Sequence, residues 1–132
     1  ASPEKIAGAM AIFDKLGLAD SQMIRVLLAN GGRHAIQAFL ETPQTLATAL
    51  QSLASDYGFQ ESSMMVILTY GNAMTVQALL ASPEKIAGAM AIFDKLGLAD
   101  SQMIRLLLAH GGRHAIRAFL ETPEDLATAL QS

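Results

Sequence analysis

The chain repeats itself, and this self-similarity constrains its fold more than any other feature. Residues 1–52 recur as residues 81–132 with five differences, and a diverged copy lies between them. A proline follows Ser or Thr at intervals of 40 residues: Ser2-Pro3, Thr42-Pro43, Ser82-Pro83 and Thr122-Pro123. A fixed period of this length is typical of repeat proteins, in which stacked neighbours bury the faces that one unit cannot bury alone. The chain therefore divides into units 2–41, 42–81 and 82–121, and residues 122–132 begin a fourth unit of what we expect to be a longer array.

Each unit is predicted to be a set of short helices punctuated by Gly and Pro. In the first unit Ile6, Met10 and Phe13 follow one another at helical spacing, and Gly17 is expected to end that helix. The pattern predicts helices, and no sheet, over 3–16, 21–30, 33–41, 43–56, 62–70, 73–81, 83–96, 101–110, 113–121 and 123–132. The expected fold is thus an all-α, right-handed solenoid of tandem 40-residue repeats.

Polar residues mark where these helices begin. A hydroxyl before Pro3 is typical of an N-cap, because proline is tolerated at the first helical position. Capping also explains Asp20 or Ser21, and Asp100 or Ser101, before the second helices of their units. Faces that a further unit should cover are expected to be exposed at Ile6, Phe13, Leu126 and Leu130.

The middle unit departs from its neighbours in two places. Asp56-Tyr57-Gly58 holds one residue more than the corresponding segment of the first unit. We interpret Tyr70-Gly71-Asn72 as one residue shorter than Ala29-Asn30-Gly31-Gly32, so that the two shifts cancel and the proline spacing survives.

Composition and charge exclude several classes of function. There is no Cys, and no apolar run reaches the roughly 18 residues of a membrane span, which indicates an intracellular protein rather than a membrane protein. No His or carboxylate pair has helical metal-ligand spacing, and no nucleophile–base pair is evident, so we expect no metal, no cofactor, no small-molecule substrate and no enzymatic activity. The net charge of −3 argues against coating by nucleic acid, but it does not describe local patches.

One half of the unit resembles a known family. Gln22, Met23, Ile24 and Val26 are followed, after a pair of residues, by Gly31-Gly32-Arg33-His34-Ala35-Ile36. This order is similar to the DNA-binding repeats of transcription-activator-like effectors and their bacterial relatives, in a longer form with HEAT-like length. The resemblance implies a short helix, a variable pair that reads a base of double-stranded DNA, and a long proline-kinked helix. It also implies that the protein could be a bacterial effector acting in a host nucleus.

The resemblance places two sets of contacts on this sequence. The implied base-reading residues are Ala29, Asn30, Tyr70, Gly71, Ala109 and His110. The implied phosphate-binding residues are Gly31, Gly32, Arg33, His34, Gly111, Gly112, Arg113, His114 and Arg117. In the family, Asn or His at the reading position goes with purines, and Gly or a missing residue goes with thymine.

Physical chemistry gives independent reasons for an anion near Gly31-Gly32. Two glycines would let backbone N–H groups approach an anion at the start of the next helix. Arg33 stands in the first helical turn, where a cation is unfavourable for the helix dipole, so an external anion would explain it better. Segments 21–40 and 101–120 contain Arg and His but no Asp or Glu, which predicts a basic edge repeated along the array.

Other interpretations of the same residues stay open. Gly31-Gly32 also suits a left-handed helix end, His34 and His114 suit a solvated surface, and the Asn30/His110 difference suits drift at an exposed turn. Of the other differences, Val26/Leu106 falls in an apolar stripe. At the level of function we therefore carry three hypotheses: a modular DNA-binding array, a HEAT- or armadillo-like protein-interaction solenoid, and a structural array that associates with itself end to end.

Overall fold

The computed structural model describes residues 3–18, 22–98 and 101–131, and their regular secondary structure is helical, with no strand among them. The helices in this part of the chain are α1 (Pro3–Lys15), α2 (Gln22–Asn30), α3 (Arg33–Glu41), α4 (Pro43–Tyr57), α5 (Glu61–Tyr70), α6 (Ala73–Ala81), α7 (Pro83–Lys95), α8 (Gln102–His110), α9 (Arg113–Glu121) and α10 (Pro123–Gln131). Each predicted helix is present, with bounds that agree to within one residue. The all-helical prediction is confirmed for the described residues.

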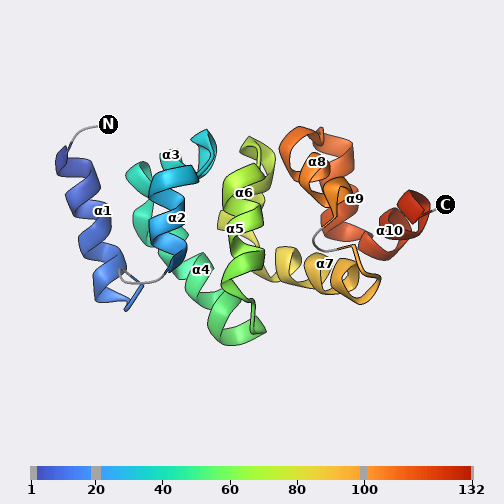
Figure 1. Ribbon diagram of the computed structural model, residues 1–132, viewed down its shortest axis with the longest axis horizontal. Helices are drawn as coiled ribbons and strands as arrows, with labels where there is room; N and C mark the ends of the chain where they lie inside the picture. Colours follow the sequence, from blue (N-terminus) through green and yellow to red (C-terminus); the bar gives the residue numbers. More distant parts are fainter. Residues whose placement is uncertain (1–2, 19–21, 99–100, 132) are drawn as a thin grey trace.

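Helices that are equivalent in successive 40-residue units pack against one another. The first helices form the series α1, α4, α7 and α10, in which each member contacts the next. The second helices α2, α5 and α8 form another series, and the third helices α3, α6 and α9 a third. The molecule is elongated, with α1 and α10 at opposite ends (Figure 1). The first helices thus bind neighbouring units together along the whole length of the molecule.

The helix ends use local chemistry, although not always as the sequence predicts. Ser101 caps α8, since its hydroxyl accepts a hydrogen bond from the N–H of Ile104 at 3.2 Å; positions 2, 20, 21 and 100 lie outside the described residues. Thr42, by contrast, makes no side-chain cap for α4. Its hydroxyl donates backward to the carbonyl of Ala38 at 3.1 Å, and the N–H of Thr42 donates to the same carbonyl at 2.8 Å, so Thr42 completes the end of α3. The hydroxyl cap expected before Pro3 falls on position 2, outside the described residues, and the equivalent Thr42 does not cap the helix that follows it.

Glycine ends the first helix of each unit in the left-handed conformation. Gly17, Gly58 and Gly97 have φ values of 76°, 67° and 75°. A residue with a Cβ would be strained there, which is why glycine is preferred. The extra residue of the middle unit lies before Gly58, in a longer α4, and the short connection between Gly58 and Glu61 absorbs it.

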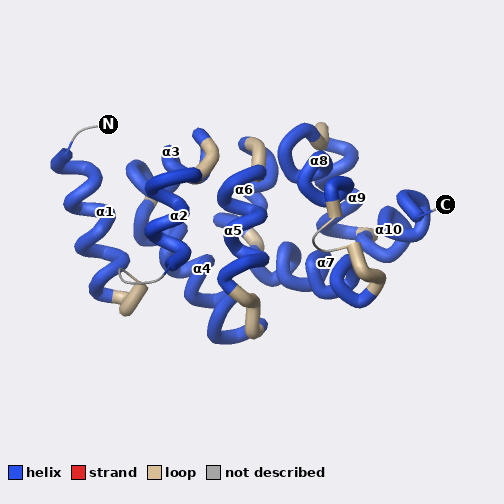
Figure 2. The backbone as a smooth tube through the Cα atoms, viewed as in Figure 1, coloured by secondary structure: helices blue, strands red, loops and turns tan. Residues whose placement is uncertain are grey.

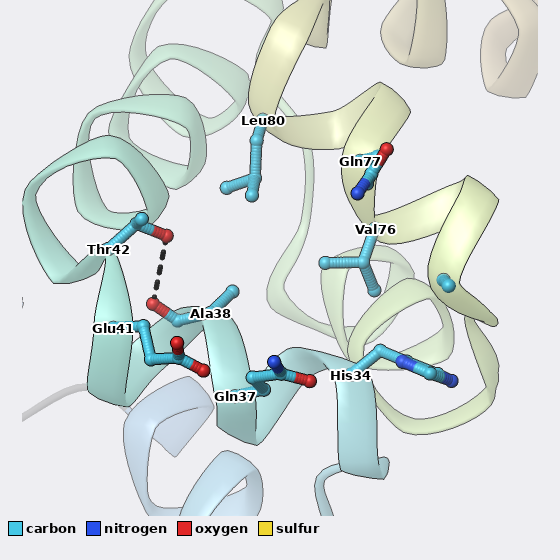
Figure 3. A pocket seen from close by; sticks show the side chains of 9 residues that line it. His34, Gln37, Ala38, Glu41, Thr42, Val76, Gln77 and Leu80 are labelled. Carbon is cyan, nitrogen blue, oxygen red and sulfur yellow. Dashed lines mark hydrogen bonds between the residues drawn. The ribbon is translucent and has the colours of Figure 1, made fainter.

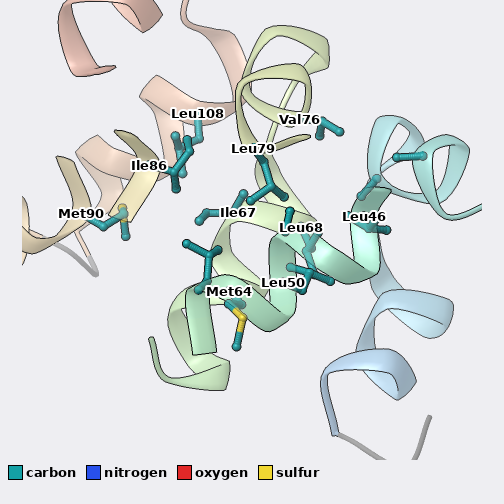
Figure 4. Close-up of a cluster of buried hydrophobic side chains, with 14 of the residues drawn as sticks. Leu46, Leu50, Met64, Ile67, Leu68, Val76, Leu79, Ile86, Met90 and Leu108 are labelled. Atoms are coloured by element: carbon teal, nitrogen blue, oxygen red, sulfur yellow. The ribbon is translucent and has the colours of Figure 1, made fainter. Parts of the chain in front are cut away.

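The core is continuous from unit to unit. Figure 4 shows that buried side chains of α4, α5, α6, α7 and α8 gather in one cluster, which includes Leu46, Leu50, Ile67, Leu68, Leu79, Ile86 and Leu108. In the first and third units an aromatic pair joins the first helix to the third. The ring centroids are 5.2 Å apart in both Phe13–Phe39 and Phe93–Phe119. Tilted and edge-on ring pairs of this kind stabilise packing beyond the area that they bury.

Burial of equivalent side chains depends on the preceding unit. Ile6 is 38% exposed, whereas its equivalents Leu46 and Ile86 are 0% and 1% exposed. Phe13 was expected to be exposed with Ile6, and this prediction is wrong: Phe13 is fully buried because Phe39 of its own unit covers it. Leu126 and Leu130 are half-buried.

Candidate nucleic-acid interface

Three short turns lie in a row along one edge of the molecule. Residues 31–32 join α2 to α3, residues 71–72 join α5 to α6, and residues 111–112 join α8 to α9. In Figure 2 these loops follow one another along the upper edge, opposite the loops that follow α1, α4 and α7. We call the residues 29–34, 69–74 and 109–114 the turn edge. It contains every position that the resemblance implies for contact with DNA except Arg117, which follows within α9.

The first glycine of each turn is required by close packing, not by an unusual backbone. A Cβ on Gly31, Gly71 or Gly111 would lie 2.4, 2.5 or 2.5 Å from the carbonyl oxygen of the residue four positions earlier. Gly71 and Gly111 have φ values near −62°, and the left-handed glycines of the described chain are elsewhere. The left-handed interpretation of Gly31-Gly32 is therefore wrong.

The middle turn has the same length as the other two. α5 ends at Tyr70 and α6 begins at Ala73, just as α2 ends at Asn30 and α3 begins at Arg33. The prediction that a residue is missing here is wrong. The extra residue before Gly58 is compensated by the short connection between Gly58 and α5, so the turn after α5 needs no deletion. Tyr70, and not Gly71, is equivalent to Asn30 and His110.

The glycine N–H groups are largely occupied inside the protein. Gly31 donates to Leu27 at 2.9 Å, Gly111 donates to Leu107 at 2.8 Å, and Gly32 donates to Leu68 of the next unit at 3.0 Å. These three N–H groups therefore have partners inside the protein, and a phosphate contact through them would have to compete with those bonds. The first turns of α3 and α9 follow Gly32 and Gly112, which supply no side-chain cap.

Cationic side chains remain available at the same edge. Arg33, Arg113, His114 and Arg117 are exposed, and His34 is half-buried. The turn edge contains no Asp or Glu. Carboxylates stand at the far ends of the same helices: Glu121, the last residue of α9, forms an ion pair with Lys85. A nine-residue helix is about 13 Å long, so the basic and acidic ends of α3 and α9 are separated. In the middle unit Ala73 and Met74 replace the Arg and His.

The predicted base-reading residues differ in how far they are exposed to solvent. Ala29, Asn30 and His110 are exposed, Ala109 is half-buried, and Gly71 is buried. A hollow of about 490 Å³ lies beside Asn30, between the ends of α2 and α5. Its other lining residues are Ser62, Met65, Val66, Thr69 and Tyr70.

Sequence reasoning missed one contact at this edge. The guanidinium of Arg105 lies 5.3 Å from the ring centroid of Tyr70, which is 39% exposed. Such cation–π pairs contribute roughly 0.5–1 kcal/mol at exposed sites. Tyr70 belongs to the middle unit and Arg105 to the third, so no local pattern signals the pair. Leu106, predicted to lie in the buried stripe, is 51% exposed.

A second concave surface lies between α3 and α6. Figure 3 shows Gln37 and Gln77 on opposite sides of a groove of about 430 Å³, with His34 and Glu41 on the α3 side. Val76 and Leu80 supply an apolar part of the lining. No motif of the sequence points to this groove. A signal was present in the equivalence of Gln37 and Gln77, which stand 40 positions apart.

Known proteins give no guide to these surfaces. No family model, no curated protein and no solved structure matches the chain. Among the described helices, none has the length and apolarity needed to cross a membrane. The described residues include no group of three or more His, Asp or Glu side chains that could hold a metal ion. The function must therefore be argued from the surfaces themselves.

Proposed function

We propose that the chain is part of a right-handed α-solenoid, related in design to transcription-activator-like effector repeats, that binds double-stranded DNA along the turn edge. The ends of α2, α5 and α8 would approach base edges in the major groove. Arg33 and Arg113, with Arg117 and the neighbouring histidines, would contact phosphates. The observation that carries this proposal is the alignment of three equivalent turns in one row, of which the first and third carry exposed cations and none carries a carboxylate.

The division of labour follows from the contacts already described. Phosphate contacts position a protein on DNA, and side chains at base edges provide specificity. Because the N–H groups of Gly31, Gly32 and Gly111 are bonded inside the protein, the positioning role falls mainly to the Arg and His side chains. The middle unit has Ala73 where the others have Arg, so it would contribute no such contact.

The spacing of units constrains how such an array could follow the duplex. Packed helices lie about 8–10 Å apart, whereas base pairs rise about 3.4 Å along the DNA axis. An array that reads one base per unit must therefore wind around the duplex, at a radius larger than that of the bases. To wind around the duplex, successive units of the solenoid must be rotated as well as translated relative to one another.

The test is a salt titration of binding to a random-sequence duplex. We expect Arg33→Ala and Arg113→Ala each to weaken binding to all sequences alike, and each to reduce the slope of log K against log salt by about one. Lys15→Ala is the matched control, because Lys15 is exposed at the end of α1, away from the turn edge. Unchanged affinity and slope in both Arg variants would refute DNA binding through this edge.

A protein-interaction solenoid is the second candidate, and the groove between α3 and α6 favours it. Side-chain amides of Gln37 and Gln77 could pair with the main chain of an extended peptide that runs across the third helices. The double variant Gln37→Ala/Gln77→Ala separates the two candidates. It should abolish binding of peptides selected from a random library and leave DNA affinity unchanged.

A further inference from the structure

The two junctions between units share one backbone hydrogen bond. At the first junction the N–H of Gly32 donates to the carbonyl of Leu68 at 3.0 Å, and at the second the N–H of Asn72 donates to that of Leu108 at 2.8 Å. Both carbonyls belong to the last turn of a second helix, where the helix itself leaves carbonyls without partners. Each turn thus caps a helix of the following unit.

The second junction has further hydrogen bonds from side chains. Asn72 donates through Nδ2 to the carbonyl of Gly111 at 2.8 Å, and its Oδ1 accepts from the N–H of Thr75 at 3.0 Å. The hydroxyl of Thr75, which is 1% exposed, donates to the carbonyl of Leu108 at 3.0 Å. We call Asn72 and Thr75 the clasp. Their equivalents at the first junction, Gly32 and Ala35, have no polar side chain.

The clasp ends on the turn of the third unit. Gly111 stands directly after His110 and two residues before Arg113, so the Asn72 amide holds the segment that carries both side chains. A buried hydroxyl–carbonyl bond in a water-poor interior is stronger than an exposed one. The clasp therefore fixes the third turn from a neighbouring unit. At the first junction, by contrast, Gly32 holds the end of α5, just before the middle turn, through its backbone bond to Leu68.

We propose that Asn72 and Thr75 are positioning residues that hold the 110–113 turn in place for its contact with DNA. This inference rests on the proposed function. It gives the middle unit a role that accounts for its departure from the repeat: it lacks the Arg that would contact a phosphate, and instead it orders the contact made by the third unit. A turn that is ordered before binding pays a smaller entropic cost on association.

The repeat itself supplies variants that the fold accommodates. Asn72→Gly and Thr75→Ala introduce the residues that the first and third units carry at these positions. In the double variant we expect amide hydrogen exchange over residues 108–116 to rise by about tenfold or more, since each of the two lost bonds contributes roughly a factor of five. Exchange over residues 30–38 should not change, which provides an internal reference.

DNA affinity gives the readout that a structural role alone would not move. The double variant should bind a random-sequence duplex about tenfold more weakly, with a melting temperature close to that of the parent chain. Its salt slope should stay the same because Arg113 is still present, whereas Arg113→Ala lowers the slope by about one.

Conservative variants separate the individual bonds. Thr75→Ser keeps the hydroxyl and should restore both readouts, whereas Thr75→Val keeps the shape and should not. Asn72→Asp keeps the oxygen that caps α6 but loses the donor to Gly111, so its exchange over residues 108–116 should rise as in Asn72→Gly; its DNA affinity is not compared, because it adds a negative charge to the turn edge. Gln44→Glu is the matched control, because it also introduces a residue that the first and third units carry, but at an exposed position in the first turn of α4, outside the clasp and the turn edge.

The outcomes are distinguishable. Unchanged exchange over residues 108–116 in the double variant overturns the clasp. Faster exchange with unchanged DNA affinity shows that the clasp is structural only, and overturns the positioning role. If the parent chain does not bind DNA, the proposed function fails together with the positioning role, and the exchange result still decides whether the clasp holds the turn.

Discussion

Within the turn edge, the first and third units differ at one position, which is Asn30 in the first unit and His110 in the third. Each is the last residue of its helix, each is exposed, and each precedes a Gly-Gly turn. Both side chains can donate to a purine N7 in the major groove, and Asn can also pair bidentately with adenine. Because the two backbones are equivalent, a difference in what the units read must come from these side chains.

Exchanging Asn30 and His110 tests whether these two side chains determine the base preference of their units. We expect the base preference to change at one position per unit, by about 1–3 kcal/mol for each good pair. The measurement is a binding selection on randomised duplexes with a long array that carries the exchange. The exchange of Gln44 with Glu124, in the first turns of α4 and α10, is the control and should leave preference unchanged.

Tyr70 changes what can be expected of the middle unit. With no residue missing, the interpretation that linked this unit to thymine through a shortened loop no longer applies. The exposed position belongs to an aromatic ring that lies against Arg105 of the next unit. Unchanged preference after the Asn30/His110 exchange would shift the weight to the peptide groove between α3 and α6.

At the scale of elements, the turns depend on the absence of a Cβ at their first glycine. The N–H of Gly71 bonds to Ile67 at 2.8 Å, and a Cβ on Gly71 would lie 2.5 Å from the same carbonyl oxygen. The end of α5 would have to open to admit a methyl group. Glycine within a helix is a different case, and Gly88 of α7 has nothing within 4 Å of its missing Cβ.

The substitutions Gly71→Ala and Gly88→Ala should therefore have opposite signs. We expect Gly71→Ala to lower the free energy of unfolding by about 1–3 kcal/mol through overpacking. Gly88→Ala should raise it by about 1 kcal/mol, because alanine favours a helix interior. Urea denaturation followed by circular dichroism measures both values. A stabilising effect of Gly71→Ala would contradict the close-packing explanation.

At the scale of the whole molecule, each unit is covered by its neighbours. Leu46 of α4 is fully buried beneath the preceding unit. Its equivalent Ile6 lies in α1, the first described helix, and is partly exposed. The packing between α1 and α4 recurs between α4 and α7 and between α7 and α10. Stability should then be close to a sum of unit and neighbour terms.

Removing residues 1–41 tests whether stability is close to a sum of unit and neighbour terms. The remaining chain should keep its helical circular dichroism signal per residue, because α4 to α10 retain their contacts with one another. It should be less stable, since newly exposed leucines such as Leu46 and Leu50 each lose part of the roughly 1.5–3 kcal/mol that full burial contributes. Collapse of the whole helical signal would show that packing depends on more than adjacent units.

The sequence by itself determines the helices of this protein. Their bounds follow from apolar residues at helical spacing and from Pro and Gly at the ends, and these signals act within a few residues of one another. For this reason even the divergent middle unit was predicted correctly at the level of its helices. The cluster of cations near the turns was visible in the sequence as well, because it is a property of composition along one segment.

Only the tertiary structure decided which groups at the turns are free to bind. Gly32 and Asn72 donate to carbonyls of the next unit, 36 residues further along the chain, and Phe13 is covered by Phe39. A repeat pattern shows that such positions are equivalent but does not show which neighbour satisfies them. A backbone donor can be satisfied by an internal carbonyl or by an external anion, and only the packing of one unit on the next determines which partner it has.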